Sequence, residues 1–299
     1  MKSNNTITIV VVCDNHYLVL LAALIKSIEI NHKSDEKIVI YIVEDKVKAK
    51  NKAKFETSID QKMITIEWIN MEKVIPENTT LPLDRSSYPL NIYMRLFIPS
   101  FLPENVDKVL YLDVDMLALA DVSELWKTDL GGNIVGAVVD PIGTIGNKWG
   151  GIGNYEALGL SPEAKYFNTG MLLMDISSWR ENNITEQVLR CVKNNKEFAN
   201  FPDQYGLNIV LYKKWKELDP LWNCFSSLDI EKPFIIHFNH RKPIYRSYDK
   251  NTQYQSLFFH YLNLTKWKGT KPIGEVRRYL KKINNIIEKL LKMPFAKPQ

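Results

Sequence analysis

The sequence predicts an α/β protein built on a mostly parallel sheet with flanking helices. Runs of apolar, β-branched residues, such as 6–13, are typical of strands buried on both faces. These runs alternate with segments of helical apolar spacing, such as 18–31, and the alternation favours crossover helices between parallel strands. With 299 residues, of which 45% are hydrophobic and 24% charged, the chain can bury a large core and has an ordinary globular composition.

The expected elements follow one another along the chain. Strands are predicted at 6–13, 37–43, 63–69, 108–112, 134–139, 166–175 and 234–237. Helices are predicted at 18–31, 47–59, 87–97 and 179–198, from 202 onward, and at 273–291. Two stretches without periodicity, 74–85 and 141–159, are predicted to be loops, and the second is expected to cover the sheet edge as a lid.

The main chemical signal follows the strand at 108–112, which ends in Asp113, Val114 and Asp115. Burial of two carboxylates without a partner is unfavourable. A divalent cation such as Mg²⁺ or Mn²⁺ removes that cost, because hard cations prefer oxygen ligands and often bind substrate phosphates as well. Two solvated loop acids are the alternative, since Asp-x-Asp is a short and common pattern.

Other acids follow strands in the same way. Asp14 follows the first strand, and Asp140 follows the strand at 134–139. Ligands of open α/β sheets bind beyond the carboxyl ends of the strands, so Asp14 is expected at the same edge as Asp113 and Asp115. The alternative is that Asp14 forms a turn or caps the next helix.

Polar residues on helices are expected near this edge. Arg95 is predicted on the inner side of its helix, where it would pair with the acids or meet a phosphate; a surface position is the alternative. Asp203 and Gln204 open the helix that begins at 202. That position either favours an anion through the helix dipole or lets Asp203 cap the helix.

The last strands add further candidates. The strand at 166–175 opens with polar residues, and Gly170 allows a close backbone approach. His237, at the end of the strand at 234–237, is a candidate metal ligand, and Lys242 is a candidate phosphate contact. The alternative is the ordinary polar content of a loop.

Together these motifs form an ordered set over residues 6–245. Its members are Asp14, Arg95, Asp113-Val114-Asp115, Phe167-Asn168-x-Gly170-x-Leu172-Leu173, Asp203-Gln204, His237 and Lys242-Pro243. The set resembles glycosyltransferase family 8, and most closely its bacterial lipopolysaccharide galactosyl- and glucosyltransferases. The resemblance implies a GT-A type nucleotide-diphospho-sugar transferase fold with a Rossmann-like sheet.

The resemblance also implies roles for individual residues. The acid that matches Asp14 holds the uracil of a UDP-sugar, and the aromatic residue that matches Tyr17 stacks on this base. Mn²⁺, with Mg²⁺ as a possible substitute, is expected on Asp113, Asp115 and His237, where it bridges the two phosphates.

The remaining matched residues are expected to contact the donor. Those assigned to nucleotide-sugar binding are Val114, Arg95, Asp140, Asn168, Thr169, His240 and Lys242. Asp203 matches the acid that hydrogen-bonds sugar hydroxyls, and Gln204 matches an amide beneath the anomeric carbon. Asp203 and Gln204 are therefore the expected catalytic residues.

The implied activity is a retaining, metal-dependent transfer of galactose or glucose from a UDP-sugar. The acceptor is expected to be a sugar hydroxyl of a lipid-linked or cell-surface glycan, and the linkage α. Gln204 is a poor nucleophile, which favours same-face attack through an oxocarbenium-like ion. Double displacement through Asp203 is the alternative, by analogy with retaining glycosidases.

One motif departs from the family pattern, which is His-x-x-Gly-x-x-Lys-Pro-Trp. Here His240 occupies the glycine position, the spacing to Lys242 is one residue shorter, and Ile244 replaces the tryptophan. The phosphate contact of Lys242 is therefore less secure than the metal contacts of Asp113 and Asp115.

The C-terminal tail differs from the rest of the chain in charge. Residues 266–299 carry a net charge of +8, which leaves −3 for the remainder of a chain with +5 in total. Apolar residues recur at helical spacing through 273–291 and alternate with Lys and Arg, which predicts a basic amphipathic helix. We expect a catalytic domain at 1–265 and a tail at 266–299 that binds an anionic membrane surface. Tyr261, Trp267 and Phe295 are expected anchors, and a helix docked on the body is the alternative.

Other sequence features bear on location and on rival functions. Cys13, Cys191 and Cys224 are odd in number and far apart, no secretory signal or membrane span is evident, and a cytoplasmic position at the inner face of the cell membrane is expected. Nucleic acid is not an expected partner, because the body is acidic. The rival hypotheses are a haloacid-dehalogenase-like phosphatase with Asp113 as nucleophile and a non-catalytic UDP-sugar-binding protein.

Overall fold

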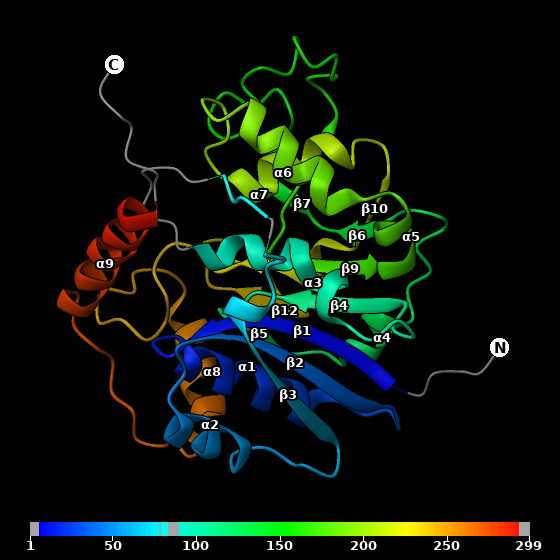
Figure 1. Ribbon diagram of the computed structural model, residues 1–299. Coiled ribbons are helices and arrows are strands. Elements are labelled where there is room, and N and C mark those ends of the chain that lie inside the picture. Colours follow the sequence, from blue (N-terminus) through cyan, green and yellow to red (C-terminus); the bar gives the residue numbers. More distant parts are fainter. Residues whose placement is uncertain (1–5, 78, 83–89, 293–299) are drawn as a thin grey trace.

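The computed structural model describes residues 6–77, 79–82 and 90–292. Its centre is a seven-stranded sheet in the order β10-β6-β9-β4-β1-β2-β3 (Figure 1). These strands are β1 (Thr6–Asp14), β2 (Lys37–Asp45), β3 (Ile64–Asn70), β4 (Lys108–Leu112), β6 (Val135–Ala137), β9 (Met171–Asp175) and β10 (Trp215–Glu217). The prediction of a mostly parallel sheet is confirmed, with β9 as the exception, because it runs antiparallel to both β4 and β6.

Helices and two small sheets complete the fold. The α-helices are α1 (Leu18–Asn31), α2 (Ala49–Glu56), α3 (Ile98–Phe101), α4 (Val122–Trp126), α5 (Ile176–Glu181), α6 (Ile184–Asn194), α7 (Pro202–Val210), α8 (Thr252–Asn263) and α9 (Val276–Lys292). The 3-10 helices are η1 (Met71–Lys73), η2 (Leu90–Phe97) and η3 (Pro220–Asn223). One small sheet joins β11 (Cys224–Phe225), β12 (Ile235–His237) and β5 (Met116–Ala118), and the other pairs β7 (Val139–Thr144) with β8 (Lys165–Phe167).

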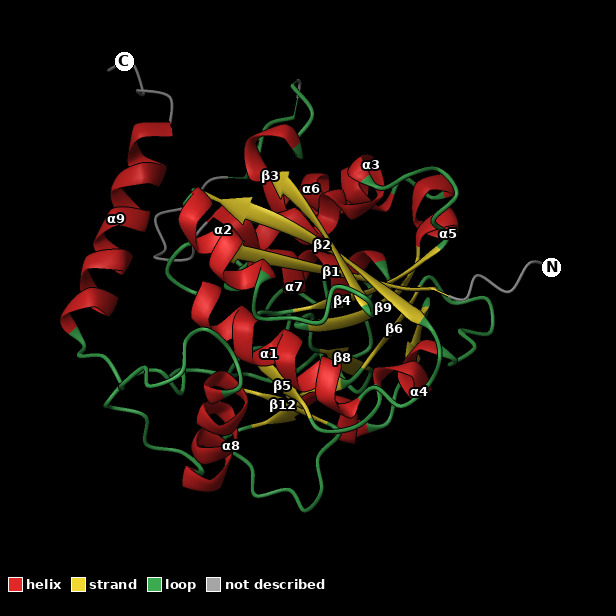
Figure 2. Ribbon diagram, turned by 90° about the horizontal axis from the view of Figure 1, so that it is seen from below, coloured by secondary structure: helices red, strands yellow, loops and turns green. Residues whose placement is uncertain are grey.

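The central sheet separates two hydrophobic cores. Along β4, Leu110 and Leu112 enter one core, while Val109 and Tyr111 enter the other, as expected from the two-residue period of a strand. The first core is shared with α1, α8 and the sheet of β5 and β12, which lie together in Figure 2. The second core is shared with η2, α5, α6 and α7. Both faces are covered, which accounts for the continuous apolar runs in the sequence.

Several predicted elements are divided in the structure. The helix predicted at 179–198 is broken into α5 and α6, because Asn183 adopts the left-handed conformation at φ 49°. The strand predicted at 166–175 is interrupted between β8 and β9. Residues 87–89 of the helix predicted at 87–97 lie outside the described residues, and the rest forms η2, a 3-10 helix.

Other elements were not predicted or take a different form. Helices α4 and α8 and strand β10 have no counterpart among the predictions. The loop predicted at 141–159 begins within β7 and continues as compact turns that bury Ile145 and Ile152. Part of the loop predicted at 74–85 lies outside the described residues, and Val74 is buried. The lid function of 141–159 stays a prediction.

Helix α9 stands apart from these layers. Figures 1 and 2 both show it at the rim of the molecule, joined to α8 by a long connection. No helix in the described parts of the chain combines the length and apolarity needed to cross a membrane.

Candidate active site

The candidate site forms where two antiparallel ladders bring polar residues to one edge of the sheet. The N–H of Asp113, just after β4, donates to the carbonyl oxygen of Gly170, just before β9, at 2.8 Å. The N–H of Phe238, just after β12, donates to the carbonyl oxygen of Asp115 at 2.8 Å. The antiparallel direction of β9 and β12 therefore places the start of β9 and the end of β12 beside the Asp-x-Asp pair.

Asp113, Asp115 and His237 meet at this edge. One carboxylate oxygen of each acid and one ring nitrogen all lie within 4.8 Å of one another, and the three residues form the one such cluster among the described residues. Asp115 is 9% exposed and His237 is 6% exposed. Two carboxylates and an imidazole are a suitable donor set for Mn²⁺ and acceptable for Mg²⁺. The arrangement fits the expected cation, which these three residues would hold.

The protein balances the charge of this cluster. Lys242 forms an ion pair with Asp115 and also donates to the carbonyl oxygen of Phe238 at 2.8 Å. Burial alone would raise the pKa of Asp115, but Lys242 and His237 hold it below its ordinary value. Burial lowers the pKa of His237, which favours the neutral imidazole that a metal requires.

Arg95 joins two carboxylates from different elements. Its Nε lies 3.1 Å from Asp203 Oδ2, and its Nη2 lies 3.1 Å from Asp113 Oδ1. Its Nη1 donates to the carbonyl oxygen of Thr169, and the guanidinium lies 4.6 Å from the ring centroid of Tyr111. Burial opposes the charge of Arg95, but Asp113, Tyr111 and Asp203 outweigh this effect and raise its pKa. Arg95 is therefore a charged, buried residue of the site and not a surface arginine.

Asp203 lies in the first turn of α7, as predicted, and the N-cap position of that helix is occupied by Phe201. Asp203 is 6% exposed, and burial raises its pKa against the effect of Arg95. Its carboxylate is thus held by the guanidinium and by a long contact of 3.4 Å from the Thr169 hydroxyl.

An amide network ties the start of β9 to α7. Asn168 Nδ2 donates to Asp140 Oδ2 at 2.9 Å, and Gln204 Nε2 donates to the same oxygen at 3.2 Å. The N–H of Thr169 donates to Gln204 Oε1 at 3.1 Å. Asp140, Asn168 and Thr169 are all buried. The structure therefore brings four residues predicted from three separate motifs into direct contact.

Asp14 lies at the carboxyl end of β1, which is parallel to β4. Its Oδ1 accepts hydrogen bonds from the N–H groups of His16 at 2.9 Å and Tyr17 at 2.8 Å, so it forms the turn before α1. Burial and the nearby Tyr245 raise the pKa of Tyr17. His16 Nε2 lies 2.8 Å from the Tyr245 hydroxyl. Asp14 therefore forms a turn, which was the alternative to ligand binding predicted from the sequence. It also lies at the same sheet edge as Asp113.

Two further predicted residues have distinct environments. His240 is exposed and adopts φ 58°, the left-handed conformation that glycine favours. His240 thus adopts a backbone conformation that suits glycine, the residue at this position of the family pattern. Val114 is half-buried and packs against the first core.

Two residues of the site were not singled out from the sequence. The Tyr111 hydroxyl donates to Asp113 Oδ1 at 2.5 Å, and Asn223 Oδ1 lies 2.9 Å from His237 Nδ1. Tyr111 had a usable signal, because residues two apart on an extended chain point the same way. Asn223 lies in η3, a short turn without periodicity, and gave no such signal.

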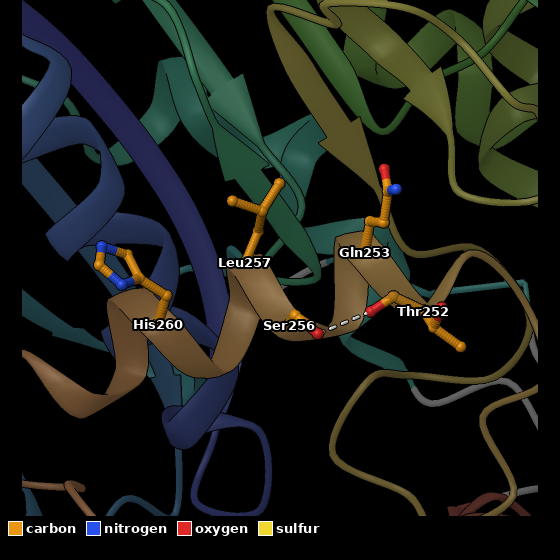
Figure 3. Close-up of a pocket in the computed structure, with 5 residues that line it drawn as sticks. All are labelled: Thr252, Gln253, Ser256, Leu257 and His260. Carbon is orange, nitrogen blue, oxygen red and sulfur yellow. Dashed lines mark hydrogen bonds between the residues drawn. The ribbon is translucent and has the colours of Figure 1, made fainter.

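A separate hollow lies on α8. It has a volume of about 480 Å³ and is lined by Thr252, Gln253, Ser256, Leu257 and His260, all shown in Figure 3. None of these residues belongs to the cluster around Asp113.

Similar proteins identify the family. The model of the family described as "Glycosyl transferase family 8" matches residues 8–272. General stress protein A of Bacillus subtilis is 28% identical over 89% of this chain and 96% of its own length. Lipopolysaccharide 1,2-glucosyltransferase of Escherichia coli is 27% identical over 69% of this chain and 56% of its own length. Glycosyltransferase GlyF of Streptococcus pneumoniae is 28% identical over 79% of this chain, which spans 56% of that protein.

Solved structures show the same fold. Galactosyltransferase LgtC, in complex with donor and acceptor sugar analogues, superposes with a TM-score of 0.72 at 23% identity, over 88% of this chain and all of that chain. The bifunctional glycosyltransferase WbbM superposes with a TM-score of 0.74 at 22% identity, over 90% of this chain and 51% of that chain. The predicted GT-A fold is confirmed. Since the family match covers most of the sequence and the ordered motifs converge on one site, this chain belongs to glycosyltransferase family 8 and is a glycosyltransferase.

Proposed function

We propose that this enzyme transfers a hexose, galactose or glucose, from a UDP-sugar to a sugar hydroxyl of a lipid-linked or cell-surface glycan. The proposed reaction depends on a divalent metal, retains the anomeric configuration and makes an α linkage. The observation that carries it is the cluster of Asp113, Asp115 and His237. Similarity to the lipopolysaccharide 1,2-glucosyltransferase and the fold shared with LgtC support this choice of donor and acceptor class.

Charge development during transfer accounts for the residues around the cluster. Departure of UDP leaves negative charge on the diphosphate, and a Mn²⁺ or Mg²⁺ ion held by Asp113, Asp115 and His237 would supply Lewis-acid stabilisation of that charge. Lys242, already directed at Asp115, is the protein cation that would share this charge. Asp14 and Tyr17 would hold the uracil, and Asp140, Asn168 and Thr169 would surround the donor sugar.

The geometry around Gln204 favours same-face attack over double displacement. Gln204 Nε2 and Oε1 are both hydrogen-bonded, to Asp140 Oδ2 and to the N–H of Thr169. Asp203 is buried against Arg95, and burial raises its pKa, so its carboxylate is engaged and less available as a nucleophile. We infer that the leaving phosphate oxygen accepts the proton of the incoming hydroxyl.

The test is a screen of UDP-galactose, UDP-glucose and UDP-N-acetylglucosamine for metal-dependent hydrolysis and transfer. The variants Asp113→Asn and Asp115→Asn should lower kcat/KM at least about 100-fold, because each removes an anionic metal ligand. Asp129→Asn, at an exposed acid outside the site, is the matched control. Near-normal rates in both site variants would refute the metal assignment, and a β-linked product would refute retention.

We also propose that residues 1–265 form the catalytic unit and that the tail at 266–299 attaches it to an anionic membrane surface. On α9 the apolar residues Val276, Leu280, Ile283, Ile287 and Leu291 are 48–79% exposed. In the sequence they are interspersed with Arg277, Arg278, Lys281, Lys282, Lys289 and Lys292. Exposed apolar residues within a basic helix suit the boundary between anionic head groups and acyl chains. The proposed location is the inner face of the cell membrane, beside a lipid-linked acceptor.

The first residues of the tail contact the catalytic unit, and these contacts determine where the tail should be truncated. The N–H of Ile273 donates to the carbonyl oxygen of Ile244 at 2.8 Å, and Glu275 contacts Arg241 and Ser247. A chain ending at Glu275 keeps these contacts and removes residues 276–299, which begin with α9. We expect it to lose sedimentation with vesicles of phosphatidylglycerol and phosphatidylethanolamine while it keeps UDP-sugar hydrolysis. Unchanged sedimentation would refute membrane attachment, and vesicles of phosphatidylcholine alone test the need for negative charge.

A further inference from the structure

Asn223 is a buried residue whose side-chain amide contacts His237 at Nδ1, on the side of the ring away from Asp115. It is 5% exposed, and it ends η3, whose start is capped by Asp219. Its Oδ1 lies 2.9 Å from His237 Nδ1, and its Nδ2 donates to Asn168 Oδ1 at 2.9 Å. Asn223 therefore joins the imidazole of the cluster to the network that contains Gln204.

The orientation of these amides follows from the groups at the ends of the chain of hydrogen bonds. Asn168 Oδ1 accepts from the backbone N–H of Gly170 at 2.9 Å, and a backbone N–H can only donate. On its other side, Asn168 Nδ2 faces the carboxylate of Asp140, which accepts. Asn168 is thus fixed with its oxygen toward Asn223, so Asn223 must present its NH₂ group to Asn168 and its oxygen to His237.

This orientation determines the tautomer of His237. Since Asn223 offers an acceptor to Nδ1, that nitrogen carries the proton and donates. In the neutral ring the lone pair is then on Nε2, which lies 3.6 Å from Asp115 Oδ1. Metal-bound histidines commonly donate their other ring N–H to a carbonyl or carboxylate oxygen, which fixes both tautomer and ring orientation.

We propose that Asn223 is a positioning residue that holds His237 in the Nδ1–H tautomer, with Nε2 directed at the carboxylates of Asp113 and Asp115. Through Asn168, the same amide fixes the metal-binding histidine relative to Asp140 and Gln204. This inference rests on the proposed metal-dependent function and deepens it. The chain of hydrogen bonds runs from His237 through Asn223 and Asn168 to Asp140, with no break.

Two substitutions separate the two hydrogen bonds of Asn223. Asn223→Leu removes both and keeps the number and branching of the side-chain heavy atoms. Asn223→Asp keeps an acceptor for His237 Nδ1–H but loses the donor to Asn168. We expect the Leu variant to bind Mn²⁺ about 10- to 100-fold more weakly. The Asp variant should bind Mn²⁺ within about three-fold of the unmodified enzyme but lose about ten-fold in kcat at saturating metal, because Asn168 and Gln204 are displaced.

Affinity for Mn²⁺ is measured by electron paramagnetic resonance of the free ion, in the presence of UDP. Asn31→Leu is the control for a general loss of stability: its side chain makes three hydrogen bonds, to Ser27, Ala118 and Tyr261, and none to the site. It should keep the Mn²⁺ affinity of the unmodified enzyme. Equal Mn²⁺ affinities of the Leu variant and the unmodified enzyme, both folded by circular dichroism, would overturn the role of Asn223.

The tautomer is measured separately by ¹⁵N NMR of the histidine rings in the metal-free protein, with His237→Gln used for assignment. We expect the Nδ1–H pattern for His237 in the unmodified chain and its loss in Asn223→Leu. An Nε2–H pattern in the unmodified chain would overturn the inference. If the unmodified enzyme binds no Mn²⁺ with UDP, the metal part of the proposed function fails, while the tautomer still decides whether Asn223 orients His237.

Discussion

The candidate site and helix α9 depart from the usual distribution of polar and apolar residues in opposite directions. At the site, charged groups are buried: Arg95, Asp115 and Asp203 are each less than 10% exposed. On α9, apolar groups are exposed, and Leu291 reaches 79%. Folding alone favours neither arrangement. Buried charge is unfavourable unless an opposite charge compensates it, and apolar surface that stays exposed contributes no free energy of burial.

The two regions differ in how they meet this cost. At the site, each charge is compensated within the protein, so that Arg95 serves two carboxylates and Lys242 a third. On α9, the exposed apolar residues join neither of the two cores of the described residues, and the proposed membrane surface is what would cover them. Substitutions at the site should therefore change stability and activity together, whereas substitutions on α9 should change only the proposed attachment.

The largest effect is expected for Arg95→Met. It leaves Asp113 and Asp203 without their shared cation, so the free energy of unfolding at neutral pH should fall by about 3–5 kcal/mol. Arg180→Met is the control. Arg180 donates to the carbonyl oxygens of Pro99 and Leu102, so its removal breaks no ion pair with a carboxylate among the described residues. Urea unfolding measures the free energy of unfolding of both variants. Equal decreases would show that the pairing of Arg95 with two carboxylates adds no stability beyond that of an arginine that donates to carbonyl oxygens.

The pH dependence of the same variant sharpens this test. Burial raises the pKa of Asp203 and Arg95 opposes it, so removal of Arg95 should raise that pKa further. An acid whose folded pKa is raised destabilises the fold only where it ionises, as pH rises above its unfolded value of about 3.9. The stability deficit of Arg95→Met should therefore be smaller near pH 4 than at pH 8. A deficit that grows toward acid pH would contradict this reasoning.

A smaller decrease in the free energy of unfolding is expected for Gly170→Ala. The added Cβ would lie 2.6 Å from His237 Cε1 and 3.0 Å from Asp113 Oδ2. Such overpacking should lower the free energy of unfolding by about 1–3 kcal/mol and weaken Mn²⁺ binding. Gly274→Ala is the control outside the site, since its Cβ would meet nothing within 4 Å. Denaturant unfolding and Mn²⁺ titration of both variants provide the comparison.

A modest increase in the free energy of unfolding is expected for His240→Gly. The residue adopts φ 58°, which is unfavourable for a side chain with a Cβ, so glycine should stabilise the fold by up to about 1 kcal/mol. Lys213→Gly, at φ 60°, is the control at a position of similar backbone conformation. Thermal unfolding measures both, and a loss of stability at 240 alone would show that the histidine side chain makes a stabilising contact.

The smallest effect on stability is expected on α9. The double variant Leu280→Ser with Ile283→Ser should leave the free energy of unfolding within about 0.5 kcal/mol, because both residues are exposed. Leu110→Ala, in the buried core, should lower it by about 2–5 kcal/mol. Vesicle sedimentation should show the reverse order. A large stability loss in the α9 variant would mean that the helix packs on the body.

The parts of the site that could be predicted from the sequence lie at the ends of strands. Asp113, Asp115 and His237 each end an apolar run, and the rule for ligands at sheet edges places such residues together. The antiparallel direction of β9 was not predictable, because a buried strand reads the same in either direction. Asn223 lay beyond prediction, since its importance depends on an amide and an imidazole that meet only after folding.

The missed helix α8 is a different case. Tyr254, Phe258, Tyr261 and Leu262 recur at helical spacing and are buried, and Asn251 caps the helix by accepting from the N–H of Gln253. The pattern was present in the sequence, but four aromatic residues in twelve favour a strand by intrinsic propensity. The break between α5 and α6 shows the opposite situation, because a single left-handed residue, Asn183, divides a segment that was predicted as one helix.

The contact of Glu275 with Arg241 and Ser247 has a mechanical consequence. Glu275 immediately precedes α9, so a force applied to the helix reaches the body through the segment that also carries Lys242. Under the proposed attachment, membrane binding and the stability of the fold depend on different parts of the chain. If the attachment holds as proposed, a designer could exchange the residues after Glu275 for a different membrane-binding sequence and keep the contacts of Glu275 with the body.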